Sequence, residues 1–253
     1  KYMEVLYIDE YSEMYEKWMG HRLTVSEASQ ISGIYKSNID YVTIFKEDLD
    51  EYLQEYKTLY LDLETNSNVN HNSFGLSLKQ EIIEKGLNND IKDIYNDVVK
   101  LRMAKQSCEI ACIRKAIKTT KTGIESLMKN VRSGMYEYQL EAYYDFEIKK
   151  DGNKPVSFKT IAASGVNATT LHYSSNNCVI QDGQLILFDL GWKDNLYCSD
   201  ITRTFPVNGK FTPLQKKIYN IVLKANKKVA SVAKAGMTLK ELQEICIEVL
   251  AEG

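Results

Sequence analysis

Two aspartates lie in settings that could give them a chemical role. Asp189 sits within residues 185–191, an apolar run typical of a strand that is buried on both faces. Asp200 follows eleven positions later (200 minus 189). A buried carboxylate without a partner is costly, so something must neutralise it. If the two segments pair as antiparallel strands, both carboxylates point into the same space.

Converging carboxylates repel one another, and either a proton or a cation relieves the repulsion. Divalent cations that prefer hard oxygen ligands, such as manganese, magnesium or calcium, suit such a pair. The residues alone leave a second interpretation open, in which Asp189 caps the turn at Gly191 and Asp200 pairs with Arg203. Aspartates near strand ends are common, so spacing alone does not decide between the two.

His172 is the only histidine in the second half of the sequence. It could hydrogen-bond a substrate carbonyl or shuttle a proton near neutral pH, although a lone histidine is more often structural. His21 and His71 lie in polar surroundings and are predicted to be surface residues. No base is spaced to activate Ser164 as a nucleophile, and the glycines form neither a phosphate loop nor a dinucleotide fingerprint.

The composition bounds the class of protein. Of the 253 residues, 44% are hydrophobic and 26% are charged, the balance of a soluble globular protein with a core. A net charge of -2 offers no attraction to nucleic acid or anionic membranes, and no apolar run approaches the roughly 20 residues of a membrane span. The five cysteines form no disulfide ladder, which predicts reduced, structural thiols and a cytoplasmic location. The start at Lys1 shows neither a signal core nor an initiator methionine, so we expect a piece of a longer gene product.

The first third of the sequence predicts alternating helices and strands, an α/β domain without its first strands. A capping box from Thr24 to Glu27 should open a short helix that ends near Gly33. The other elements expected here are a helix over 47–56, a strand over 58–63, a polar loop over 66–72 and a helix over 77–86.

The remainder predicts helices followed by strands. A long amphipathic helix should run from 107 to near 134, and a second from 136 to 150, with a domain boundary near 95–105. Strands over 177–180 and 184–190 flank Asp182-Gly183, a dipeptide typical of hairpin turns, and a third strand should cover 197–205. Thr212-Pro213 should open a helix to about 234, and a capping box at Thr238 another that runs to the end of the chain.

Three segments carry a family resemblance: TIAASGVNATTLHY at 160–173, LFDLG at 187–191 and SDITRTFPV at 199–207. In this order and spacing they closely resemble the catalytic domain of Xaa-Pro aminopeptidases and prolidases, the pita-bread metallopeptidases. The likeness continues through 209–215 and back through 101–105, the usual start of that domain, while 18–23 is similar to part of the domain before it. It covers nearly the whole chain and is most specific between 160 and 215.

The resemblance implies an incomplete α/β creatinase-like domain over residues 1–98, followed by an incomplete α+β pita-bread domain over 99–253. It also implies two divalent metal ions, usually manganese, which activate a water molecule for attack on a peptide carbonyl. Carried over to this sequence, Asp189 chelates one metal, Asp200 bridges both, and His172 contacts substrate and assists proton movement. As a further hypothesis, Thr202, on the same strand face as Asp200, holds a ligand by a hydrogen bond.

One departure from the family pattern is serious. Family members supply three further ligands, a histidine and two glutamates, from sequence beyond the point where this chain stops. The acids that follow Leu239 are the glutamates at 241, 244, 248 and 252, on or at the end of one predicted helix, and none matches those motifs. We therefore expect weak or absent metal binding and no peptidase activity from this polypeptide by itself.

The resemblance implies that the full-length parent hydrolyses the N-terminal Xaa-Pro bond of proline-containing peptides, as an aminopeptidase or a strict dipeptidase, and forms a homodimer. Methionine aminopeptidases have a similar aspartate spacing in the same fold, but the N-terminal domain argues against that activity. An alternative from another class is a metal-free pita-bread module that binds peptides or proteins. The presence of Asp189, Asp200 and His172 argues against the module, because a binding surface needs no buried acids.

Overall fold

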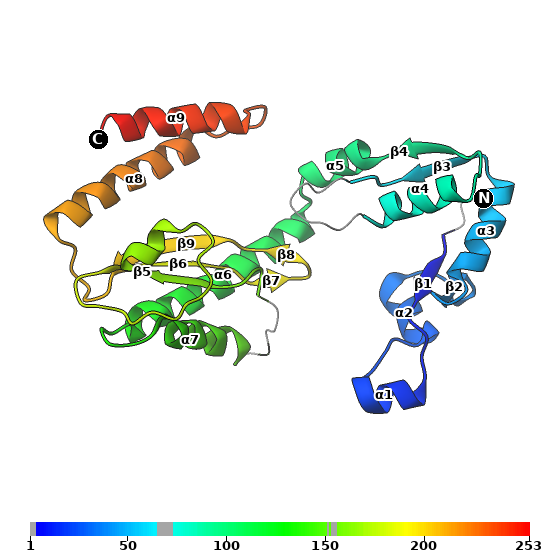
Figure 1. Ribbon diagram of the computed structural model, residues 1–253, viewed down its shortest axis with the longest axis horizontal. Coiled ribbons are helices and arrows are strands. Elements are labelled where there is room, and N and C mark those ends of the chain that lie inside the picture. Colours follow the sequence, from blue (N-terminus) through cyan, green and yellow to red (C-terminus); the bar gives the residue numbers. More distant parts are fainter. Residues whose placement is uncertain (1–3, 65–72, 151, 153–155) are drawn as a thin grey trace. The chain divides into compact units, whose positions relative to one another are not determined.

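The computed structural model describes residues 4–64, 73–150, 152 and 156–253 (Figure 1). It divides into two compact units, Lys1–Ala104 and Lys105–Gly253, so the division falls a few residues after position 98. The predicted polar loop over 66–72, His71 and Asp151 lie outside the described residues. Within the part of the chain that is described, no helix is both long and apolar enough to cross a membrane.

The first unit is built from short parallel strand pairs flanked by helices. Strand β1 (Leu6–Ile8) pairs with β2 (Ile39–Tyr41), and β3 (Thr58–Leu61) pairs with β4 (Asp90–Asp93). The helical elements are α1 (Glu13–Met19), α2 (Val25–Ser32), the 3-10 turn η1 (Lys36–Asn38), α3 (Phe45–Glu55), α4 (Phe74–Glu84) and α5 (Tyr95–Met103). Its small core joins α3 and α4 through Leu49, Leu53, Leu78 and Ile82. This is the α/β arrangement that the alternating pattern predicts.

The predicted start and end of α2 are confirmed. The Thr24 hydroxyl accepts a hydrogen bond from the backbone amide of Glu27 (3.3 Å), and the Glu27 carboxylate accepts one from the backbone amide of Thr24 (2.8 Å). This reciprocal pair satisfies amides that have no partner inside the helix. At the other end Gly33 has a φ of 76°, a left-handed conformation that is cheap for glycine.

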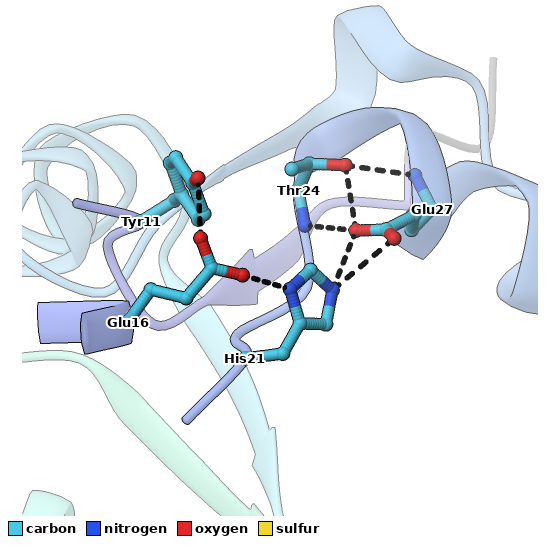
Figure 2. A network of polar contacts seen from close by, with 5 residues as sticks. All are labelled: Tyr11, Glu16, His21, Thr24 and Glu27. Atoms are coloured by element: carbon cyan, nitrogen blue, oxygen red, sulfur yellow. Dashed lines mark hydrogen bonds and ion pairs between the residues drawn. The ribbon is translucent and has the colours of Figure 1, made fainter. Parts of the chain in front are cut away.

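His21 joins the ends of α1 and α2 (Figure 2). Its Nδ1 atom lies 2.6 Å from a carboxylate oxygen of Glu16, and its Nε2 atom lies 3.1 Å from a carboxylate oxygen of Glu27. Tyr11 donates a hydrogen bond to the other oxygen of Glu16 (2.7 Å). His21 is therefore an exposed residue, as predicted, but it also links two helices.

The second unit contains a three-stranded antiparallel sheet in the order β5 (Ile161–Ser164), β6 (Leu185–Leu190) and β9 (Ile201–Pro206). Between β6 and β9 the chain forms a small hairpin of β7 (Lys193–Asp194) and β8 (Tyr197–Cys198). The helical elements are α6 (Ser107–Asn130), α7 (Glu137–Lys149), the 3-10 helix η2 (Gly165–Thr169), α8 (Pro213–Val232) and α9 (Leu239–Ala251). Figure 1 shows α6 and α7 along one face of the sheet.

The core of this unit lies between that helical layer and the sheet. Alternate residues of β6 are fully buried against the helical layer, namely Ile186, Phe188 and Leu190. Leu127 of α6 and Leu140 of α7 pack into the same cluster. Each such side chain contributes about 1.5–3 kcal/mol by leaving water. The apolar faces that the periodicity of α6 and α7 predicts thus pack against the sheet, as expected.

Two predictions about β6 are wrong. The strand is buried on one face only, since Leu185, Leu187 and Asp189 on the other face are partly exposed. The hairpin across Asp182-Gly183 is also absent, although Gly183 does adopt a positive φ of 75°. Both edges of β6 are already occupied by β5 and β9, so the preceding segment forms only an isolated bridge to Tyr136. Pairing between distant segments has overridden the local turn signal.

Two smaller predictions also need correction. The single strand expected over 197–205 is divided into β8 and β9, because Ser199 turns inward and hydrogen-bonds the backbone of Trp192. The five cysteines are free thiols, but none is fully buried, and Cys198 is exposed. A structural role in the core therefore does not describe them. The capped helices at Thr212 and Thr238 are confirmed as α8 and α9.

Candidate metal centre

Asp189 lies on the central strand of the sheet. It pairs with Ile161 of β5 on one side and with Thr202 of β9 on the other. Its side chain points away from the face of β6 that α6 and α7 bury, because side chains alternate along a strand. The Thr202 hydroxyl donates a hydrogen bond to a carboxylate oxygen of Asp189 (2.9 Å). One oxygen of the acid is thus oriented by the neighbouring strand.

Asp200 immediately precedes β9 and lies two residues before Thr202, the residue that contacts Asp189. Burial, the negative charge of Asp189 and a hydrogen bond with the Asp189 carboxyl together raise the pKa of Asp200. The two acids therefore lie close enough to compete for ionisation. Asp200 and Arg203, both of which are described, form no ion pair, and Arg203 instead donates to the carbonyl oxygen of Thr202 (2.7 Å).

Gly191 and Ser199 hold the backbone between the two acids. A Cβ atom on Gly191 would lie 1.9 Å from the carbonyl oxygen of Ser199, so no larger residue fits there. The buried hydroxyl of Ser199 contacts the Thr120 hydroxyl of α6 (2.7 Å) and accepts a hydrogen bond from the Trp192 amide (2.9 Å). In the sequence, only the small size of these two residues indicates this role.

His172 lies on the loop that follows η2, and its side chain is exposed. It forms no hydrogen bond with Asp189 or Asp200, although all three residues are described. The structure therefore brings together Asp189, Asp200 and Thr202, and it leaves His172 on a separate segment. The roles of these four residues remain predictions.

The donor set is suited to part of a metal site. Two carboxylates and a hydroxyl are hard oxygen donors, which manganese and magnesium prefer. A groove of about 570 Å³, lined by Asp200 and Thr202 together with residues of α6 and α8, adjoins the pair. Across residues 4–64, 73–150, 152 and 156–253, however, no group of three or more histidine, cysteine, aspartate or glutamate residues could hold a metal ion. The pair fits two ligands of a larger set.

Comparison with known proteins shows the family of this chain. Residues 111–253, which include both acids and the whole sheet, match the model of metallopeptidase family M24. The chain belongs to that family. The Xaa-Pro aminopeptidase of Haemophilus influenzae is 30% identical over 250 residues, which cover 98% of this chain and 56% of that protein.

Solved structures agree with this assignment to family M24. The chain resembles Pseudomonas aeruginosa aminopeptidase PepP with a TM-score of 0.84 and 29% identity, over 97% of this chain and 56% of that one. It also resembles zinc-substituted Escherichia coli aminopeptidase P in complex with product, with a TM-score of 0.82, 28% identity and the same shares of the two chains. The predicted fold class is confirmed, an α/β unit followed by an α+β unit of the pita-bread type. The chain spans just over half the length of these relatives.

Proposed function

We propose that this M24 protein hydrolyses the N-terminal Xaa-Pro bond of peptides with the help of two divalent metal ions. The observation that carries the proposal is the pair of interacting carboxylates inside the region that matches the family: Asp189 on β6, and Asp200 immediately before the neighbouring strand β9. The name of the Haemophilus influenzae relative supports the choice of bond. Proline-containing peptides are accordingly the proposed substrates.

Each site residue has a proposed task. Asp189 and Asp200 hold the metal ions, which when bound supply Lewis acidity and an activated water. Thr202 keeps one oxygen of Asp189 fixed by its hydrogen bond of 2.9 Å, which leaves the other oxygen available as a ligand. His172 hydrogen-bonds the substrate carbonyl and assists proton movement near neutral pH.

Manganese is the proposed metal, because all the donors in this part of the site are hard oxygens. A histidine and two glutamates would complete the ligand set. Two carboxylates alone bind a divalent ion weakly, so the 253-residue chain on its own is expected to be inactive. We further propose that the complete enzyme is a cytoplasmic homodimer.

The test compares the 253-residue chain with the full-length gene product. Each is loaded with manganese, assayed for metal content and incubated with an Xaa-Pro dipeptide and a tripeptide that has proline in second position. We expect turnover and two bound ions only for the full-length protein, and dependence on peptide length separates aminopeptidase from dipeptidase. Turnover by the short chain at the full-length rate would refute its inactivity, while an inactive, metal-loaded full-length protein would refute the function.

A metal-free module that binds peptides or proteins is the second candidate. The observation in its favour is that the described residues contain no group of three potential ligands. The same metal analysis separates the two candidates, because a well-folded full-length protein that takes up no manganese would support the module. The repulsion between Asp189 and Asp200 favours the enzyme, since a binding surface gains nothing from it.

A further inference from the structure

Glu137, the first residue of α7, is a fully buried carboxylate outside the candidate metal centre. A charge in that position requires several hydrogen-bond donors. Glu137 has five: the backbone amides of Ser164 (2.7 Å) and Cys178 (3.0 Å), the hydroxyls of Ser164 (2.8 Å) and Tyr173 (2.7 Å), and the side-chain amide of Asn167 (3.0 Å). Five donors fill the roughly four lone-pair positions that the two oxygens of a carboxylate offer.

These donors all belong to one segment, residues 164–178, which starts at the last residue of β5, includes η2 and is called the 164–178 loop. They come from both its first and its second half. One oxygen of Glu137 receives the donors from Ser164 and Asn167, where the loop leaves β5. The other receives Tyr173 and Cys178, where the loop returns. A single carboxylate therefore closes the loop, and His172 lies between its two points of attachment.

Glu137 carries its negative charge in this arrangement. Burial by itself acts to raise the pKa of Glu137, but the hydrogen bonds, led by that from the Ser164 amide, lower it below the ordinary value. Burial and the hydrogen bond to Glu137 raise the pKa of Tyr173, so its hydroxyl remains a donor. Hydrogen bonds to an ionised acceptor are about twice as strong as those between neutral groups.

A second contact attaches the returning half of the loop to the start of β5, the strand beside that of Asp189. Asn176, 2% exposed, accepts a hydrogen bond from the Ala162 amide (3.0 Å) and donates to the carbonyl oxygen of Thr160 (2.9 Å). These two residues flank Ile161, the partner of Asp189 in the sheet. The loop that carries His172 is thus attached beside the position of Asp189.

We propose that Glu137 is a positioning residue, whose buried carboxylate holds the 164–178 loop and, through Tyr173, places His172 relative to Asp189 and Asp200. This proposal rests on the proposed function, because it is the proposed function that gives His172 a role in catalysis. A purely structural Glu137 would stabilise the fold without any particular coupling to His172. A positioning role and a purely structural role differ in the effect that substituting Glu137 has on kcat when the His172 side chain is already absent.

The main experiment is a double-mutant cycle in the manganese-loaded full-length enzyme. Glu137→Gln replaces an acceptor oxygen with an amide that cannot receive all five donors, and we expect kcat to fall roughly 10- to 100-fold with KM and metal content unchanged. In a His172→Ala background the same substitution should have no further effect on kcat. An equal loss of kcat in both backgrounds would overturn the proposal.

A matched control and a milder variant keep the result interpretable. Glu147→Gln lies on the same helix, where Glu147 pairs with Lys150, and should leave kcat unchanged. If Glu137→Gln does not fold, Tyr173→Phe removes a single donor and should lower kcat in the same background-dependent way. Loss of activity in Glu147→Gln equal to that in Glu137→Gln would count against a special role for Glu137.

A spectroscopic measurement separates this proposal from the proposed function. In the 253-residue chain the ring resonances of His172 should move in Glu137→Gln and stay in place in Glu147→Gln, whether or not any peptide is cleaved. An inactive wild-type enzyme with shifted His172 resonances refutes the peptidase and supports the positioning role. Unchanged His172 resonances in a folded Glu137→Gln chain refute the positioning role alone.

Discussion

At the scale of the residue, the two acids of the candidate centre are not equivalent. Asp189 is anchored by Thr202 on the neighbouring strand, whereas Asp200 has a raised pKa through burial and the nearby Asp189 charge. In the absence of metal this pair is a source of instability above the pKa of Asp200. A divalent cation would turn the same repulsion into affinity, because binding requires the ionised carboxylates.

Replacing Asp200 should therefore stabilise the metal-free protein. A raised pKa means that the folded state holds the Asp200 proton more tightly than the unfolded state does. The resulting contribution to stability is therefore complete below the ordinary pKa of 3.8 and is lost as pH rises through the raised pKa. Asp200→Asn should increase the free energy of unfolding at neutral pH by about 1 kcal/mol or less, because the carboxylate is only partly desolvated and water still screens its charge, and should have no effect in acid. Urea unfolding on both sides of the pKa checks this, with Asp182→Asn on the exposed turn as the control. A gain that persists in acid would show that charge is not the cause.

Gly191 should tolerate no side chain. Gly191→Ala places a Cβ atom 1.9 Å from the backbone oxygen of Ser199, and backbone cannot swing aside as a flexible side chain does. We expect a loss of about 1–3 kcal/mol in the free energy of unfolding, measured thermally, and a smaller stabilisation of the full-length protein by manganese. Gly183→Ala is a useful comparison, because it meets open space and strains only its positive φ, at a cost of about 1 kcal/mol. Wild-type stability in Gly191→Ala would mean that the close approach is not required.

At the scale of the element, α7 has two tasks on its one buried face. Its apolar residues Leu140, Tyr144 and Ile148 fill the core beneath the sheet. Its first turn holds Glu137 against the 164–178 loop. The helix thus joins the sheet that carries the acids to the loop that carries His172.

The junction of α1 and α2 should respond to pH. The hydrogen bond to Glu16 raises the pKa of His21, and hydrogen bonds lower the pKa of Glu16 (first from His21) and of Glu27 (first from the Thr24 backbone). The histidine contribution is complete below the ordinary value of 6.5 and lost as pH rises through the raised pKa, while the glutamate contributions are present above 4.5 and lost as pH falls.

The amides of α1 and α2 should accordingly be best protected from hydrogen exchange between those two values. His21→Gln should remove the decline on the alkaline side and leave the acid side, because the Thr24–Glu27 capping box remains. Exchange measured over a pH series, corrected for the intrinsic rate, tests this. A wild-type profile in His21→Gln would exclude the ring as the cause.

At the scale of the whole molecule, the two units have separate cores. The cluster of the first unit joins α3 and α4, and that of the second joins α6, α7 and the sheet, with no residue in common. Their stabilities should therefore be separable. Phe188→Ala should destabilise the second unit by about 3–5 kcal/mol and leave exchange in the first unchanged, and Leu53→Ala should do the reverse, with a cost of about 2–5 kcal/mol. Loss of protection in both units from either substitution would show that they unfold together.

Some features of this protein follow from the sequence because they are local. Thr24 with Glu27 defines the start of α2, Thr212-Pro213 that of α8, and the apolar period after Ser107 defines α6, since a cap or a helix face depends on residues within a few positions. The family was also predictable, because the motifs around Asp189 and Asp200 are short and continuous, whereas the spacing of the two acids alone left their pairing open. The hairpin at Asp182-Gly183 was predicted by the same local logic and is wrong.

What only the tertiary structure decided involves residues that are distant in sequence. Thr202 meets Asp189 because β9 pairs with β6, and Glu137 meets the His172 loop because α7 packs beneath β5. In the sequence Glu137 looks like any acid in the first turn of a helix, where the helix dipole favours negative charge. Its burial and its five donors arise from long-range packing, and no local pattern encodes which segments will pack together.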